Sequence, residues 1–369
     1  MASETQVLIL GATGYMYVKS TIVSEFLSQP ADQDFTSGGS IIAELLRSPA
    51  SKLSISALIR RSEQAAKLDS LGVKPILFDG LDDLEACINA ASQHDLVINA
   101  ASASHDRSAK ALIEGLALRQ KATGKECYLI HTSGTSILGD HLYTGTPQDQ
   151  KIWSDEKDNI FEMEKNHPER YGQRVTDVTV VETGLRLGVK TYIVVPPTIY
   201  GQGDGPFATL SQQVPNFARL TRKRGFAVVI ESGKGIWNHV HIADLSAFYG
   251  LLFCAVIEQK TWLPSGPEAI FFVESGEHTW LQVSQGIADA MQKSGLLATN
   301  EVKSISLKEA AAEITGGNES LAEITLASNS RARADLARNR LGWSTLRGLA
   351  DFLDHFDAEI SAMLGELRG

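Results

Sequence analysis

The chain has few cysteines and none in a paired motif, which argues against a cysteine-ligated zinc site and against a redox-active dithiol. Only 3 cysteines occur among 369 residues. Cys87, Cys127 and Cys254 are far apart, lie in apolar surroundings and form no C-x-x-C pair, so neither a zinc ribbon nor a redox dithiol is expected. We expect reduced core thiols and no metal site.

The chain also lacks an excess of positive charge and a long apolar run. Acidic residues outnumber basic ones by 44 to 34, giving a net charge of −10, and a nucleic-acid partner would need a basic surface. The amino terminus carries no basic n-region, and the longest apolar stretch, Leu245 to Ile257, is too short to cross a bilayer. We therefore expect a cytoplasmic enzyme with no nucleic-acid or membrane partner.

The most informative stretch is QVLILGATGY, from Gln6 to Tyr15. Val7 to Leu10 form a continuous aliphatic run, which predicts a strand buried on both faces of a parallel sheet. Gly11 and Gly14 follow at once, and their spacing permits a sharp turn whose backbone approaches a pyrophosphate at the start of the next helix. The pattern predicts the first βα unit of a dinucleotide-binding fold, although glycine pairs also form plain turns.

The text GATGY resembles the fingerprint G-x-x-G-x-x-G of the extended and atypical short-chain dehydrogenase/reductase superfamily. Its third glycine is missing, because position 17 is Tyr17, and the pair Gly38-Gly39 comes later. Omitting residues 17–37 restores the motif and an apolar helical repeat from Ile41 to Leu46. We interpret this segment as an insertion in the phosphate-binding motif, with a retained intron as one hypothesis. The alternative is a separate helix, Val18 to Leu27, followed by a loop.

The resemblance implies a doubly wound α/β fold, with a parallel Rossmann sheet and a smaller C-terminal α/β substrate lobe. We expect residues 1–200 to form the NAD(P)-binding domain and residues 201–369 the substrate lobe, interleaved with the first. In the family, the fingerprint turn and the helix after it hold the cofactor. The resemblance assigns this role here to Gly11, Thr13, Gly14, Tyr15, Met16 and Gly38.

The next strands predict how the adenosine end is recognised. Leu53 to Ile59 form a predicted second strand that ends on Arg60 and Arg61. An acidic residue here favours a free ribose 2′-hydroxyl, whereas arginine accommodates a 2′-phosphate. Two arginines predict NADP, with NAD the less favoured cofactor; the alternative is a basic strand end exposed to water. After a third strand, Lys74 to Phe78, the resemblance places Asp79 near the adenine, unless an acidic turn caps a helix there.

Two further segments resemble the nicotinamide side of the family's site. After a fourth predicted strand, Leu96 to Asn99, Ala100 and Ala101 provide a ledge of small residues on which a cofactor can lie. The text KTYIVVPPTIYG, from Lys190 to Gly201, is similar to the sixth strand and the proline turn after it. Pro196 fixes the chain direction where the backbone approaches the nicotinamide.

The catalytic residues are only partly matched. A fifth strand, Cys127 to His131, opens into T-S-G-T-S, in which Ser133 resembles the active-site serine. The family's Tyr-x-x-x-Lys pair, whose lysine lowers the pKa of the tyrosine, is absent. Tyr171 is followed four residues later by valine and Tyr143 by proline. We expect another proton donor, with Tyr171 the first candidate and Tyr143 the second.

Two structural alternatives accompany these assignments. Tyr171 would merely cap a helix if that helix starts near His167-Pro168. Trp237 to Leu245 resembles the family's V-H-V-x-D-L segment, which joins the lobes and starts a helix with Asp244 near the free amides. The histidines of this segment share a strand face, but no third ligand is suggested, so we expect structural histidines rather than a metal site.

The resemblance implies an NADP-dependent oxidoreductase that reduces or oxidises a small carbonyl or imine substrate. An imine suits the missing pair, because a protonated imine is already electrophilic. The alternatives are a non-catalytic NAD(P)-binding redox sensor, an epimerase-type enzyme with retained cofactor, and a non-binding product of mis-splicing. A homodimer is expected only by analogy with the family.

Overall fold

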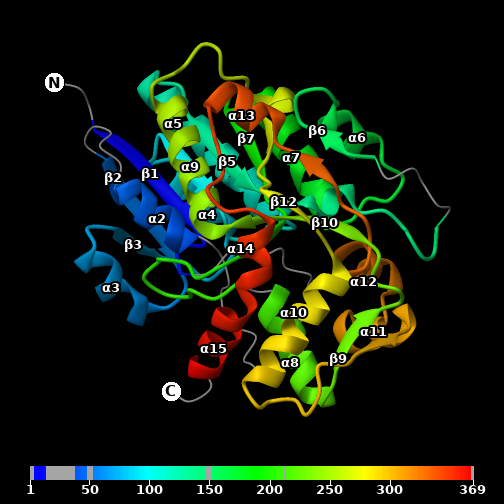
Figure 1. The fold of residues 1–369 in the computed structure, drawn as a ribbon. Helices are drawn as coiled ribbons and strands as arrows, with labels where there is room; N and C mark the ends of the chain where they lie inside the picture. The colour runs from blue at the N-terminus through cyan, green and yellow to red at the C-terminus, as the bar shows by residue number, and fades with distance from the viewer. Residues whose placement is uncertain (1–3, 14–37, 48–52, 146–150, 212, 367–369) are drawn as a thin grey trace.

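The computed structural model describes residues 4–13, 38–47, 53–145, 151–211 and 213–366 (Figure 1). Its larger lobe contains a seven-stranded sheet in the order β11-β7-β5-β4-β1-β2-β3, with every neighbouring pair parallel. The strand order reverses between β1 and β4, which is the topological switch point of a doubly wound sheet. The predicted α/β fold is confirmed. The strands are β1 (Thr5–Leu10), β2 (Leu53–Ile59), β3 (Lys74–Leu77), β4 (Leu96–Asn99), β5 (Tyr128–Thr132), β7 (Lys190–Val195) and β11 (Ile270–Phe272).

Helices cover both faces of this sheet. The connections from β1 to β2 and from β4 to β5 run in opposite directions across it, so right-handed crossovers place their helices on opposite faces. One layer contains α2 (Gly38–Arg47) against α9 (Ile242–Ile257), and the other contains α4 (Leu84–Ala91), α5 (Asp106–Thr123) and α7 (Gly172–Leu187) side by side. Val7 to Leu10 are fully buried between these layers, which explains their uninterrupted aliphatic run.

The smaller lobe is built around short sheets and helices that lie below the large sheet in Figure 1. β10 (Ile236–His241) pairs with β8 (Thr198–Tyr200) and β12 (Gly276–Thr279), and β9 (Ala227–Ile230) pairs with β13 (Val302–Ile305). Its helices are α8 (Gln213–Arg224), α10 (Trp280–Lys293), α11 (Leu307–Ile314), α12 (Glu319–Leu326), α14 (Leu349–Asp354) and α15 (Phe356–Glu366).

Shorter elements connect the two lobes. β6 (Trp153–Ser154) pairs with β14 (Ala332–Arg333), and α6 (Ile160–Asn166) and α13 (Asp335–Leu341) follow them in the chain. β11 belongs to the large sheet although it follows residue 201, so the chain crosses between the lobes more than once. The proposed domain boundaries remain a prediction.

One predicted helix cap is wrong. The N-cap of α9 is His241, whose ring nitrogen Nδ1 accepts the Ala243 N–H at 3.1 Å. The Asp244 carboxylate instead accepts the backbone N–H of Arg347 at 3.1 Å and its guanidinium at 3.2 Å. Asp244 therefore anchors the segment before α14 rather than the start of α9.

Two predicted helices have different bounds. The helix expected to start near His167 begins at Gly172, because His167 is the extended residue that ends α6. The amphipathic pattern from Asp351 to Leu364 predicts one helix, but the structure has two there, α14 and α15, that meet at His355. The three cysteines are free thiols. Among the residues described, no group of side chains is arranged to hold a metal ion and no helix is long and apolar enough to cross a membrane.

Candidate active site

The predicted site residues that the structure describes lie mainly at one edge of the large sheet. Because the strands are parallel, their carboxyl ends meet at that edge, and ligands of doubly wound folds bind there. The residues directly after the strands, or one further on, are Gly11 after β1, Arg60 after β2, Asp79 after β3, Ala100 after β4, Ser133 after β5 and Pro196 after β7.

The phosphate-binding turn is held together by glycine contacts. Gly11 adopts a φ of 81°, and Gly38 is the first residue of α2. A Cβ added at Gly38 would lie 2.6 Å from the Gly11 carbonyl carbon and 2.8 Å from the Ala12 nitrogen, so only glycine fits. This close approach places the α2 N-terminus beside the turn after β1. Gly14, Tyr15, Met16 and residues 17–37 lie outside the described residues.

A second glycine contact brings the smaller lobe to the same helix. A Cβ on Gly205 would lie 2.6 Å from the Gly39 carbonyl carbon. Asp204 also accepts a 2.6 Å ion-pair contact from Arg47 at the end of α2. The first N–H groups of an α-helix have no partner within the helix, and α2 begins beside the turn after β1, which buried Thr13 follows in the chain. These are features that a dinucleotide pyrophosphate needs. The described residues therefore fit an NAD(P)-type cofactor.

On the adenosine side, Arg60 is exposed directly after β2. Arg61 is extended, with φ −119° and ψ 123°, and precedes a 3-10 turn at Ser62–Gln64. Asp79 is exposed after β3, whereas Asp83 caps α4 by accepting the Ala86 N–H at 3.1 Å. The acidic turn thus includes a helix cap, and a role for Asp79 at the adenine remains a prediction.

On the nicotinamide side, three loops and the start of α7 converge. The Thr135 N–H donates to the Pro196 carbonyl at 3.0 Å, which ties the loop after β5 to the proline turn. A Cβ on Gly172 would lie 3.1 Å from the Ser104 Cβ, so α7 starts against the loop after β4. Ala100 in that loop is buried and Ala101 is half-buried. The arrangement is a small-residue floor bordered by β5 and α7.

The structure places the two predicted catalytic hydroxyls in different surroundings. Ser133 is buried, and its hydroxyl donates to Asp177 of α7. Tyr171 occupies the N-cap position of α7 without a side-chain cap, and its hydroxyl donates to Gln173 Oε1 at 3.3 Å. Burial raises the pKa of Tyr171 above its ordinary value, so its phenol is held neutral.

Sequence reasoning missed two neighbours of Tyr171. The Ser136 hydroxyl also donates to Gln173 Oε1, and Gln173 Nε2 donates to the Gly134 carbonyl at 3.0 Å. Ser136 is the last residue of the T-S-G-T-S string, and Gln173 is two residues after Tyr171. The second candidate, Tyr143, donates or accepts a 3.0 Å bond with Ser232 after β9. The catalytic assignments of Ser133 and Tyr171 remain predictions.

Arg174 fixes the loop that follows Ser133. This side chain is 2% exposed, and its Nε and Nη2 atoms donate to the Ile137 carbonyl at 2.9 and 2.7 Å. Nη1 donates to the Glu169 carbonyl at 3.0 Å, and the guanidinium lies 4.9 Å from the centre of the Tyr171 ring. Arg174 therefore positions both the loop after β5 and Tyr171.

We expect Arg174→Met to destabilise the protein by about 2–4 kcal/mol, because buried carbonyls lose their donors while the packing volume is kept. Denaturant unfolding would measure this change. Arg186→Met, at the exposed end of the same helix, serves as the control and should change stability by less than about 0.5 kcal/mol. Equal stability of the two variants would contradict the role assigned to Arg174.

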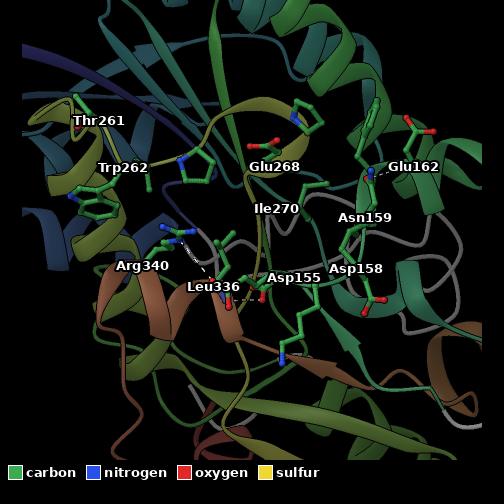
Figure 2. Close-up of a pocket in the computed structure, with 17 residues that line it drawn as sticks. Asp155, Asp158, Asn159, Glu162, Thr261, Trp262, Glu268, Ile270, Leu336 and Arg340 are labelled. Atoms are coloured by element: carbon green, nitrogen blue, oxygen red, sulfur yellow. Dashed lines mark hydrogen bonds and ion pairs between the residues drawn. The ribbon is translucent and has the colours of Figure 1, made fainter.

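A separate cavity of about 710 Å³ lies beside the edge strand β11 (Figure 2). It is lined by α6, α13 and the loop after α9, and none of the predicted cofactor or catalytic residues lines it. Asp155 at this cavity accepts the backbone N–H groups of Phe272 and Leu336, each at 2.8 Å. Burial raises the pKa of Asp155 to about 7. Its bonds join β11 to α13, which is a structural role.

Comparison with known proteins agrees with this geometry. The oxidase ucsJ of Acremonium sp. is 32% identical over 298 residues, covering 75% of this chain and 82% of the relative. The UDP-glucose 4-epimerase of Thermotoga maritima has a TM-score of 0.61 at 13% identity, covering 98% of this chain and 100% of that one. The dTDP-glucose 4,6-dehydratase DesIV of Streptomyces venezuelae, solved with NAD and TYD bound, has a TM-score of 0.63 at 12% identity, with 98% of each chain covered. No protein-family model matches the chain.

The fold, the glycine turn and the curated relative together define the class. The chain belongs to the extended short-chain dehydrogenase/reductase superfamily. Its similarity to an oxidase indicates an enzyme of the oxidoreductase type.

Proposed function

We propose that the protein is an NADP-dependent oxidoreductase that acts on a small organic carbonyl or imine. The observation that carries the proposal is the contact of Gly38 with the Gly11 turn, at the same sheet edge as two arginines that close β2. The turn supplies N–H groups for the pyrophosphate, and arginine suits a ribose 2′-phosphate. A cytoplasmic location, a small-molecule substrate and a homodimer are parts of this proposal.

At the nicotinamide end, different residues of the chain would support the cofactor and orient the substrate. Ala100, Ala101 and Pro196 would support the cofactor, which when bound supplies the hydride chemistry. Ser133 would orient the substrate heteroatom, and Tyr171 would hold its neutral phenol near Ser136. Valine stands four residues after Tyr171, so no lysine is available there to lower the pKa of the phenol. This favours an imine, whose protonated form already attracts hydride.

The direction of the reaction is a second part of the proposal. The curated relative is named an oxidase, which favours removal of hydride from an amine or alcohol. Hydride transfer is reversible in principle, and the same residues would serve both directions. A non-catalytic redox sensor, or an epimerase that retains its cofactor, would use the same cofactor site without net turnover of the cofactor.

We expect the double substitution Arg60→Ala, Arg61→Ala to weaken NADPH binding by about 10- to 100-fold and to leave NADH binding nearly unchanged. Loss of charge-assisted hydrogen bonds to one phosphate accounts for this range. Cofactor fluorescence titration would measure it, with Arg186→Ala, which removes one exposed positive charge at the end of α7, as the control. A variant that still prefers NADPH as strongly as the wild-type protein would contradict the assigned phosphate recognition.

A further inference from the structure

A cluster of buried polar side chains lies behind Ser133, and these side chains have no role in the function proposed above. His131 of β5, Asp177 of α7 and Glu164 of α6 are each at most 1% exposed. The Ser133 hydroxyl donates to Asp177, and the Glu164 carboxyl lies beside that of Asp177, close enough to affect its pKa. The cluster thus links a hydroxyl at the sheet edge to two carboxyls in the interior.

The histidine in this cluster is neutral. Burial lowers the pKa of His131 to about 3. Its Nδ1 lies 3.1 Å from Asn99 Nδ2, a donor, which assigns the ring proton to Nε2. That Nε2 atom lies 3.5 Å from Asp177 Oδ1. His131 therefore presents a neutral N–H to the carboxyl pair and brings no positive charge to it.

Among the described side chains, the basic group at ion-pair distance from the carboxyl pair is His131, which is neutral. The positive charge of Arg174 lowers the pKa of Glu164, but by less than burial and Asp177 raise it. The Arg174 guanidinium donates to backbone carbonyls and to His167. Two ionised carboxylates in such a place would be strongly disfavoured. Both Glu164 oxygens and Asp177 Oδ1 have no hydrogen-bond partner among the described residues. Ionised carboxylate oxygens only accept hydrogen bonds, so the two carboxyls can bond to each other only when one of them carries a proton.

The two carboxyls hold their protons to different degrees. Burial and the neighbouring Asp177 raise the pKa of Glu164 well above its ordinary value, which favours the protonated carboxyl. Burial raises the pKa of Asp177 to about 7, although the bonds from Ser133 and Glu164 act in the opposite direction. Asp177 therefore exchanges its proton near neutral pH, which suits a group that gives and takes protons during turnover.

We propose that Asp177 and Glu164 form the proton store of the active site, and that Ser133 passes its proton to the substrate. This inference rests on the proposed oxidoreductase function. During reduction, the substrate carbon gains the hydride, and the electron pair of its C=O or C=N bond moves to the heteroatom. The heteroatom takes the Ser133 hydroxyl proton, Ser133 takes the Asp177 proton, and water reprotonates Asp177 later. Oxidation runs the same transfers backwards.

In this arrangement Ser133 is the catalytic residue, whereas Asp177 and Glu164 are positioning residues that act through it. The hydroxyl hydrogen of serine can rotate, so Ser133 can accept from protonated Asp177 while it donates outward. After the transfer, the Asp177 carboxylate accepts from both Ser133 and Glu164. These bonds stabilise the charge that the transfer leaves in the interior. This proton relay, from Asp177 through Ser133 to the substrate, takes the place of the absent Tyr-x-x-x-Lys pair.

The first test needs no substrate. Carbon-13 NMR of labelled Asp and Glu carboxyls across pH 5 to 9 should show one aspartate with a midpoint near 7 that is missing in Asp177→Asn. Asp155 should give a second such resonance, which Asp177→Asn leaves in place. Ser133→Ala should raise the Asp177 midpoint, because the carboxylate loses a donor. Glu162→Gln, an exposed change on α6, is the control and should leave the midpoint unmoved.

The second test asks whether binding of the cofactor changes the protonation of Asp177. The oxidised nicotinamide ring is positively charged, so binding of NADP⁺ at pH 7 should favour the Asp177 carboxylate and release a fraction of a proton. Calorimetry in buffers of different ionisation enthalpy measures that release. We expect it in the wild-type and Glu162→Gln proteins, and we expect it to be lost in Asp177→Asn while NADP⁺ still binds.

The outcomes separate the relay from the proposed function. A protein in which Asp177 is ionised throughout pH 5 to 9, or in which Ser133→Ala leaves its midpoint unmoved, would overturn the relay even if NADP⁺ binds. Proton release that persists in Asp177→Asn would also overturn it. Failure of the wild-type protein to bind either cofactor would instead overturn the proposed function, and with it the relay that rests on that function.

Discussion

Substitution of Gly38 by valine is expected to weaken binding of both NADPH and NADH by more than 100-fold. A Cβ at this position would lie 2.6 Å from the Gly11 carbonyl carbon and 2.8 Å from the Ala12 nitrogen. Both neighbours are backbone atoms, so no side chain can move aside, and α2 must shift away from the turn after β1. The N–H groups at the start of α2 would then miss the pyrophosphate, and several charge-assisted bonds of about 1.5–3 kcal/mol each would be lost.

Fluorescence titration with each cofactor measures this loss, and thermal unfolding separates it from loss of the fold. Gly365→Ala is the control, because an added Cβ within α15 meets no atom within 4 Å. That control should bind normally and be as stable as the wild-type protein or slightly more so, since alanine favours a helix by up to about 1 kcal/mol. A folded Gly38→Val protein that binds within a few-fold of wild type would place the pyrophosphate elsewhere.

The second large effect concerns stability and pH. Burial raises the folded-state pKa of Asp177 to about 7, from an ordinary value of 3.8. A carboxyl with a raised folded-state pKa stabilises the fold at low pH, and this stabilisation is lost as the pH rises through the folded-state value. Asp177→Asn cannot ionise, so it escapes that loss. The free energy of unfolding of Asp177→Asn, measured relative to that of the wild-type protein, should therefore increase by on the order of 2–4 kcal/mol between pH 4 and pH 8.

Urea unfolding of both proteins at several pH values measures the difference directly. The comparison with wild type removes the contributions of buried groups that do not contact Asp177, such as His239, whose pKa burial lowers to about 4. Those groups titrate in both proteins. A stability difference that stays constant from pH 4 to pH 8 would show that Asp177 is not the group that loses a proton in this range.

Much of the fold could be predicted from local sequence. The ranges Leu53–Ile59 and Leu96–Asn99 are strands with the predicted bounds. Each is a compact apolar block between turn residues, so its limits are set by neighbours in the sequence. The order of the strands followed from the family resemblance and from the alternation of strands and helices.

The buried part of the site could not be predicted in this way. Glu164 and Asp177 lie on different helices and meet only because α6 and α7 pack together. In the sequence each is an ordinary acidic residue of an amphipathic segment. Arg174 likewise looks like a surface residue, but its guanidinium is buried against the carbonyls of the loop after β5. These roles depend on tertiary contacts rather than on spacing along the chain.

The smaller lobe was predicted less well for the same reason. The pairing of β9 with β13 joins residues that are more than seventy positions apart. The break between α14 and α15 occurs at His355, whose ring lies against Tyr200 and Phe352. The amphipathic pattern alone predicted a continuous helix, because it does not record the aromatic contacts that stop it.

The central claim is that this chain binds NADPH at the turn between β1 and α2. Titration of NADPH and NADH against the full chain, and against a version lacking residues 17–37, tests that claim most directly. We expect the shortened chain to bind NADPH more tightly than NADH, because the deletion joins Gly38 to the fingerprint and leaves Arg60 and Arg61 in place. Equal binding by the full chain would show that the segment is tolerated. If neither protein binds either cofactor, the account is contradicted at its first step.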